Sequence, residues 1–157
     1  MEIIKLQQRD LVKQNKTKLV NVIYNNFPDL EDVPNVEHTP VSITRTLESK
    51  EAVLFLAMQN NKIAGYLLAE IIYLEDGRKV LFISYIYVAP VLRNSGLGKK
   101  LMFHAFSYGN DNFCDGVMLI YDSTDKLLRN FYGKLGFMLD FNMRRYERHD
   151  VFYKVLY

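Results

Sequence analysis

The sequence has almost no cysteine and no long apolar run, and each absence narrows what the protein can be. Cys114 is the one cysteine among 157 residues, which excludes an internal disulfide and a cysteine-rich zinc site. No apolar run approaches the ~20 residues of a membrane span. Met1 to Leu6 lead straight into charged and amide residues, unlike a signal peptide. We therefore expect a soluble cytoplasmic protein with no bound metal and no membrane partner.

An excess of one charge is lacking too. Lysine and arginine number 20 against 18 acidic residues, a net charge of +2, whereas a nucleic-acid-binding domain usually presents a strongly basic face. We expect no nucleic-acid partner. Because 49% of the residues are apolar, the chain has enough material for a core. The length predicts one domain over residues 1–157.

The apolar pattern changes from helical spacing to alternation and back along the chain, which predicts a mixed-sheet α/β domain. Helices are expected at residues 10–27, 40–48, 97–109 and 125–135, the second capped by Thr39-Pro40 and the last by residues 122–124. Strands are expected at residues 3–6, 52–59, 62–73, 79–88, 116–121, 137–143 and 151–155. Asn60-Asn61 forms the turn of an early hairpin, and a charged turn around Arg148 to Asp150 closes a late one.

A glycine loop lies between the predicted strand 79–88 and the predicted helix 97–109. Its sequence is Arg93-Asn94-Ser95-Gly96-Leu97-Gly98-Lys99. The N-terminus of a helix offers unpaired amides and a partial positive charge, and glycines allow close approach to the backbone. The loop therefore predicts a phosphate site. The alternative is a loop that merely turns the chain.

Two other families with phosphate loops fit this sequence poorly. A Walker A loop needs glycine where Arg93 stands and Ser or Thr where Lys100 stands. A dinucleotide fingerprint needs a third glycine, and Leu101 occupies that position. A dinucleotide fingerprint also lies near the start of a βαβ unit, whereas most of the predicted sheet precedes this loop. A nucleotide-binding protein of either kind is therefore disfavoured.

Two motifs together resemble the Gcn5-related N-acetyltransferase (GNAT) superfamily. The first is Arg-x-x-Gly-x-Gly, starting at Arg93 after the strand end Val88-Ala89-Pro90. The second lies in residues 121–137, which contain Phe131-Tyr132-Gly133-Lys134-Leu135-Gly136-Phe137. Both stand in the family order and at the family distance. The resemblance covers most of the chain and implies an α/β (α+β) fold: a mixed, mostly antiparallel sheet of about seven strands, splayed at its middle and flanked by about four helices.

The resemblance also implies an activity, namely transfer of the acetyl group of acetyl-CoA to a primary amine by direct attack. It assigns pantetheine to the backbone of Ile86, Tyr87 and Val88, and the pyrophosphate to the loop Arg93 to Lys99. Tyr132 would stand near the thioester sulfur as general acid. Asp125 takes the place of a frequent family asparagine, where a negative charge beside phosphates is unhelpful. We therefore expect Asp125 to cap its helix and point away.

The general base is left open. Some relatives carry a carboxylate on the strand before the loop, but residues 82–85 contain none. The candidates are Glu70, Tyr85, or a water chain that ends at either. The missing carboxylate also supports an alternative function, a non-catalytic acyl-CoA-binding regulatory or sensor module. The retained Tyr132 argues against that alternative.

The acceptor and the oligomeric state are open as well. A small molecule, a polyamine or a peptide could supply the amine, and the chain could be a monomer or a homodimer. Glu31, Asp32 and Glu37 favour a cationic amine, although solvated loop charge explains them equally well. His38 is a candidate substrate contact. The cluster Arg144, Arg145, Arg148 and His149 is expected to be a solvated hairpin.

Overall fold

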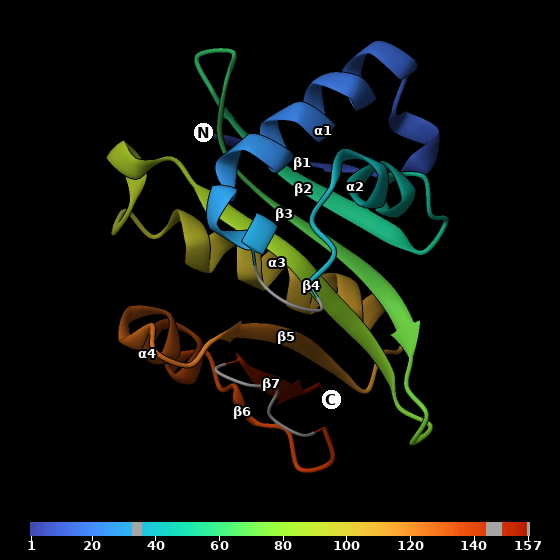
Figure 1. Cartoon of the computed structure of the whole chain (residues 1–157), viewed down its shortest axis with the longest axis vertical. Coiled ribbons are helices and arrows are strands. Elements are labelled where there is room, and N and C mark those ends of the chain that lie inside the picture. Colours follow the sequence, from blue (N-terminus) through green and yellow to red (C-terminus); the bar gives the residue numbers. More distant parts are fainter. Residues whose placement is uncertain (33–35, 144–148, 157) are drawn as a thin grey trace.

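The protein is built on one seven-stranded sheet with helices on both faces (Figure 1). The computed structural model describes residues 1–32, 36–143 and 149–156. The strands are β1 (Glu2–Leu6), β2 (Ala52–Gln59), β3 (Lys62–Tyr73), β4 (Lys79–Val88), β5 (Gly116–Asp122), β6 (Met138–Leu139) and β7 (His149–Val155). The helices are α1 (Lys13–Asn26), α2 (Pro40–Leu47), α3 (Leu97–Asp111) and α4 (Lys126–Lys134), with 3-10 turns η1 (Gln8–Asp10), η2 (Pro28–Asp32) and η3 (Pro90–Leu92).

The strand order is β1-β2-β3-β4-β5-β7-β6, and β4–β5 is a parallel pair in an otherwise antiparallel sheet. This arrangement confirms the predicted mixed sheet with four α-helices among the described residues. The early hairpin is confirmed as well. Asn60 and Asn61 both adopt positive φ, 51° and 60°, as the tightest hairpin turn requires.

Two apolar layers enclose the sheet. Side chains of α1 and α2, including Ile23 and Ile43, pack with Leu68 on one face. Side chains of α3 and α4, including Leu101 and Tyr132, pack on the other face. Figure 1 shows the same division, with α1 and α2 over β1 to β3 and α3 behind the sheet. The two faces are therefore distinct surfaces, and the predicted site residues divide between them, with Tyr132 on one and Tyr85 on the other.

β4 and β5 part after a short contact. Their pairing runs over Val80–Gly116, Leu81–Val117 and Phe82–Met118 and ends there. Figure 1 shows the two strands diverging from this closed end. β3 follows β4 up to the pair Gly65–Val88, so the second half of β4 is held by β3 alone. The predicted splay is confirmed.

A bulge in β4 decides which side chains face which layer. Leu68 pairs with Tyr85 and Ala69 pairs with Ile83, which leaves Ser84 as an extra residue. An inserted residue reverses the alternation of side chains beyond it. Ile83 accordingly packs with the α3 layer, whereas Tyr85, two residues later, packs with the α1–α2 layer.

Several predicted boundaries are wrong. The strand expected at residues 137–143 is reduced to β6 (Met138–Leu139), because Asp140 turns inward to an ion pair with Arg78. His149 and Asp150 belong to β7 rather than to a turn. The N-cap of α4 is Asp125, whose side chain accepts from the Leu128 amide at 3.0 Å, and not a residue in 122–124.

Some predictions fall partly or wholly outside the described residues. Arg144, Arg145 and Arg148 of the basic cluster lie there, as does the start of the charged turn around Arg148. None of the helices in the described part of the chain combines the length and the apolar character needed to cross a membrane.

Candidate functional site

The open half of β4 presents backbone groups to the gap beside β5. Ile86, Tyr87 and Val88 all lie beyond the last β4–β5 pair, so β5 takes no part in their hydrogen bonding. β3 approaches them closely on the other side, and a Cβ added to Gly65 would lie 2.6 Å from the Tyr87 carbonyl oxygen. One edge of this segment is thus fixed while the other edge faces the gap. Such an edge can bind an extended, amide-containing ligand.

The predicted phosphate loop begins directly after β4. η3 turns the chain, and the Arg93 side chain folds back so that its Nε donates to the Val88 carbonyl at 3.1 Å. Asn94 adopts a φ of 63°, and the Ser95 hydroxyl donates to the Leu92 carbonyl. These contacts lie within a few residues of one another along the chain, so the shape of the first half of the loop depends on local sequence.

The loop ends at the N-terminus of α3. Gly96 is the N-cap with a φ of 88°, and its carbonyl accepts the first helical bond, from Lys100, at 3.1 Å. The amides of Leu97, Gly98 and Lys99 therefore begin the helix without intrahelical acceptors. Open space surrounds Gly96, since a Cβ there would meet no atom within 4 Å. The predicted residues thus form a helix N-terminus that can bind an anion.

The two sequence motifs meet in space. A Cβ on Gly98 would lie 3.3 Å from the ring of Phe131 on α4, so the start of α3 packs against the helix of the second motif. Tyr132, the next residue, is buried with its ring among those of Tyr121, Phe131 and Phe137. Its ring therefore fills the core, and its predicted place beside the thioester sulfur stays a prediction.

The hydroxyl of Tyr132 is distinguished by having no hydrogen-bond partner among the described residues. No fully buried side-chain oxygen or nitrogen of those residues lacks a partner, so this oxygen must reach the accessible surface. Burial of the ring, with a smaller contribution from Asp125, raises the pKa of Tyr132 well above the usual value near 10. The phenol is therefore protonated at neutral pH and free to donate to a ligand.

Asp125 is committed to its helix. Its carboxylate accepts from the Leu128 amide, as an N-cap does. The expectation that Asp125 caps α4 is therefore confirmed. Whether it also contacts a cofactor stays a prediction.

Tyr85 and His38 form a buried contact on the opposite, α1–α2 face. The Tyr85 hydroxyl and His38 Nδ1 are 2.7 Å apart, and His38 Nε2 lies 3.0 Å from the Tyr24 carbonyl oxygen. The ring of Tyr24 stacks on the imidazole at 5.1 Å, and Phe27 packs against both His38 and Tyr85. Sequence analysis named the two residues separately but could not join them, since 47 positions separate them.

The acidic candidates occupy different places. Glu70 pairs with Phe82 at the closed end of the β4–β5 gap, two residues along β3 from the partner of Tyr85. Its side chain has no hydrogen bond to a described residue, and its role as base stays a prediction. Glu37 is exposed and pairs with Arg45 at 3.4 Å, which reduces the negative charge it would offer a cationic acceptor.

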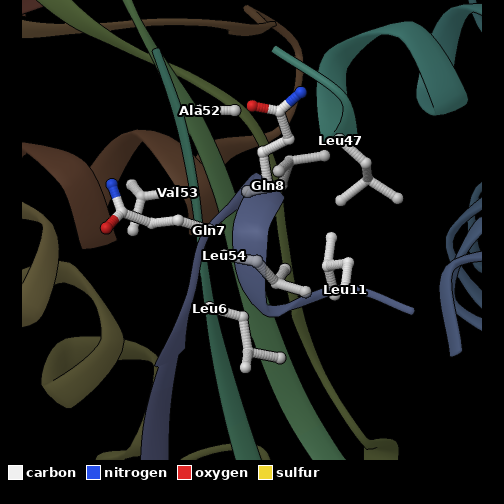
Figure 2. A pocket seen from close by; sticks show the side chains of 9 residues that line it. Leu6, Gln7, Gln8, Leu11, Leu47, Ala52, Val53 and Leu54 are labelled. Atoms are coloured by element: carbon white, nitrogen blue, oxygen red, sulfur yellow. The ribbon is translucent and has the colours of Figure 1, made fainter. Parts of the chain in front are cut away.

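A pocket elsewhere in the molecule is unrelated to these residues. Figure 2 shows it at the end of β1, where Leu6, Leu11 and Leu54 line it with other, mainly apolar, side chains. None of the predicted site residues lines it. The described residues also contain no group of three or more His, Cys, Asp or Glu side chains placed to hold a metal ion.

The splayed sheet and the exposed, glycine-rich start of α3 can now be compared with known proteins. The model of the acetyltransferase (GNAT) family matches residues 19–137. The chain therefore belongs to the GNAT family of acetyltransferases, whose members use acetyl-CoA. A search among curated proteins finds no significant match.

Solved structures share the fold over almost the whole chain. Escherichia coli ElaA superposes with a TM-score of 0.72 at 18% identity, covering 98% of each chain. An acyl-CoA N-acyltransferase from Pseudomonas aeruginosa gives 0.76 at 18%, covering 98% of this chain and 99% of its own. The NatC complex bound to Gag peptide and CoA gives 0.67 at 20%, covering 99% and 98%. At these identities the likeness establishes the fold alone.

Proposed function

We propose that the protein transfers the acetyl group of acetyl-CoA to a primary amine, with Tyr132 as the general acid. The observation that carries this proposal is the open edge of β4, because residues 86–88 lie beyond the last pair with β5 and are followed along the chain by the exposed N-terminus of α3. The hydroxyl of Tyr132, which has no hydrogen-bond partner among the described residues, would supply a third contact. An elongated thioester with a pyrophosphate at one end would use all three.

The charge and the exposed backbone groups of these residues support coenzyme A as the ligand. The positive end of the α3 dipole and the exposed Lys99 and Arg93 suit a pyrophosphate. The backbone of Ile86 to Val88 would bond the amides of pantetheine, in place of a β5 partner. When bound, acetyl-CoA supplies an activated acetyl thioester for attack by the amine. A backbone N–H in this segment would then face the thioester carbonyl, where negative charge develops.

Tyr132 would assist the departure of sulfur. A thiol has an ordinary pKa near 8.5, below that of Tyr132, so complete proton transfer from the phenol would be uphill in water. Burial of a thiol in the gap would raise its pKa as well, which would reduce the mismatch. Tyr132 would donate its proton to sulfur as the carbon–sulfur bond breaks and recover one from solvent.

The first experiment separates donors. Thermal shifts are measured with CoA, acetyl-CoA, ATP and NAD, and we expect stabilisation by CoA and acetyl-CoA. Stabilisation by ATP alone would contradict the proposal. Thiol release from acetyl-CoA is then followed with a panel of small amines, polyamines and peptides. CoA binding without thiol release for any amine would favour the non-catalytic acyl-CoA-binding module, which the absence of a carboxylate on the open half of β4 supports.

The second experiment tests Tyr132. We expect Tyr132→Phe to lower the turnover number by ~10²-fold or more, the usual contribution of a general acid, with the affinity for CoA nearly unchanged. Tyr108→Phe is the matched control, because Tyr108 is also buried on this face and accepts a hydrogen bond from Gln7. It should leave turnover intact. Weakened CoA binding in Tyr132→Phe would instead assign Tyr132 a packing role.

A further inference from the structure

The protonation state of His38 follows from its two contacts. The Tyr24 carbonyl can only accept, so Nε2, 3.0 Å away, must carry a proton. In the neutral imidazole Nδ1 then has the lone pair. The Tyr85 hydroxyl, 2.7 Å from Nδ1, must therefore be the donor. His38 is thus oriented by one hydrogen bond and ready to accept a proton through the other, as a general base is in other enzymes.

Tyr85 lies where an acceptor amine would need a base. It stands on the open half of β4, next to Ile86, whose backbone borders the gap. The bulge at Ser84 turns its side chain to the α1–α2 face, whereas Tyr132 lies in the layer on the opposite face. An amine approaching Tyr85 and a sulfur departing toward Tyr132 would therefore use opposite faces of the sheet, so the two proton transfers would not compete for the same space.

We propose that Tyr85 and His38 form the proton relay that deprotonates the acceptor amine. The inference rests on the proposed function and supplies its missing base. As the amine nitrogen bonds to the acetyl carbon, its N–H bond breaks and the proton passes to the Tyr85 oxygen. The original Tyr85 proton passes to His38 Nδ1. The resulting imidazolium keeps its Nε2–H bond to the Tyr24 carbonyl and later returns its proton to solvent.

The surroundings of the pair explain why both residues are needed. Burial raises the pKa of Tyr85 to about 12, so Tyr85 does not ionise at neutral pH and needs a proton acceptor behind it. Among the described residues, Tyr24, Phe27 and Tyr85 make the hydrogen bonds and ring contacts to the imidazole. The neighbouring Glu37 is turned to Arg45. His38 Nδ1 is therefore the acceptor placed to take the proton from Tyr85.

The relay is tested by pH profiles of kcat/KM for an amine that the wild-type protein acetylates. His38→Asn keeps an acceptor for the Tyr85 hydroxyl but cannot take up a proton, and Tyr85→Phe removes the relay. We expect both to lower kcat/KM by ~10-fold or more and to change the acid limb of the profile from that of the wild type. The kcat/KM of the double variant should be no lower than that of either single variant. The affinity for CoA should stay within about twofold of the wild type in all three, since Tyr85 and His38 pack on the α1–α2 face and not against the loop.

His104→Asn is the matched control, because His104 is exposed on α3 with its ring against Phe55; its profile should match the wild type. An acid limb that is unchanged in His38→Asn would overturn the relay. Loss of the acid limb in Glu70→Gln would also overturn it and would assign the base to Glu70. Nitrogen chemical shifts of His38 give a readout without turnover: protonation at Nδ1 in the neutral form would overturn the relay. Failure of the wild type to bind CoA or release thiol would instead count against the proposed function.

Discussion

Gly96 and Gly77 share a left-handed backbone and open surroundings, but only Gly96 lies in the predicted phosphate loop. Gly96 has a φ of 88° at the start of α3, and Gly77 has a φ of 95° in the turn between β3 and β4. A Cβ on either would meet no atom within 4 Å. An alanine at either position therefore carries the same backbone strain, about 1–2 kcal/mol. The two positions differ only in what approaches from outside, so they separate strain from ligand contact.

We expect Gly96→Ala to lower the affinity for CoA by more than tenfold, since its methyl group would stand where a phosphate approaches the amides. Both variants should lower the free energy of unfolding by a similar amount, but Gly77→Ala should leave the CoA affinity unchanged. Titration calorimetry and denaturant unfolding of both variants provide the comparison. Equal loss of CoA affinity in the two would show that strain rather than contact is responsible.

At the scale of elements, the N-cap residue of α4 has two separable effects, one on the stability of the helix and one on the pKa of Tyr132. Asp125 stabilises the N-terminus of α4 through the Leu128 amide, and its charge contributes to the raised pKa of Tyr132. Asparagine caps helices about as well as aspartate and carries no charge. The family preference for asparagine at this position therefore suggests a test in which cap and charge are separated.

Asp125→Ala should lower the free energy of unfolding by about 1 kcal/mol, because the Leu128 amide loses its acceptor. Asp125→Asn should lower the free energy of unfolding much less, because asparagine still caps the helix. It should also bind CoA more tightly than the wild type, since it removes a negative charge from the helix that packs against the start of α3. Urea unfolding and CoA titration measure the two effects. Thr39→Ala, which removes the α2 cap, is a control with a similar stability loss. Tighter CoA binding in that variant would contradict the electrostatic explanation.

The strands also show which parts of the fold could be predicted from the sequence. The bounds of β2, β3 and β4 agree with those predicted, because alternation and the turn residues Asn60-Asn61 are local signals. β6 is shorter than the alternation in residues 137–143 predicted, because the inward turn of Asp140 toward Arg78 depends on a residue 62 positions away. The bulge at Ser84 had no local signal either, and it alone decides the face on which Tyr85 lies.

At the scale of the whole molecule, Arg78 joins the two halves of the splayed sheet. Its guanidinium donates to Asp140 at 2.6 Å and to Asp76 at 2.8 Å. The rings of Phe141 and Tyr153 lie 4.6 and 4.5 Å from it. The next residue begins β4 beside the closed end of the gap. The β3–β4 turn is thus tied to the segment after β6, and the sheet opens only at the other end.

The protonation of Asp140 makes this junction sensitive to acid. Burial tends to raise the pKa of Asp140, but hydrogen bonds from Arg78 and from the Met143 and Asn142 amides outweigh it, so the pKa is lowered from 3.8. A lowered pKa in the folded state stabilises the protein above the unfolded value near 3.8, and this stabilisation is lost as the pH falls through the folded value.

Arg78→Met should lower the free energy of unfolding at pH 7 by about 1–3 kcal/mol, since the covered Asp140 carboxylate loses its charged partner. The difference from the wild type should narrow below about pH 4, where Asp140 is protonated in the variant. Denaturant unfolding at pH 7 and pH 3.5 measures both effects. Arg45→Met is the control, because both members of the Arg45–Glu37 pair are more than 60% exposed and such pairs contribute about 0–1 kcal/mol. A difference independent of pH would contradict the assignment to Asp140.

By itself the sequence determined the family and the positions of most strands and helices, because these signals depend on neighbours within a few residues. It also predicted the phosphate loop. It named Tyr132, Tyr85 and His38 as candidates from motif position and residue type. Only the tertiary structure decided that His38 contacts Tyr85 and that Tyr85 and Tyr132 lie on opposite faces of the sheet. Those relations depend on a loop packing across α1 and on one extra residue in β4, and neither long-range packing nor strand register leaves a periodic signal in the chain.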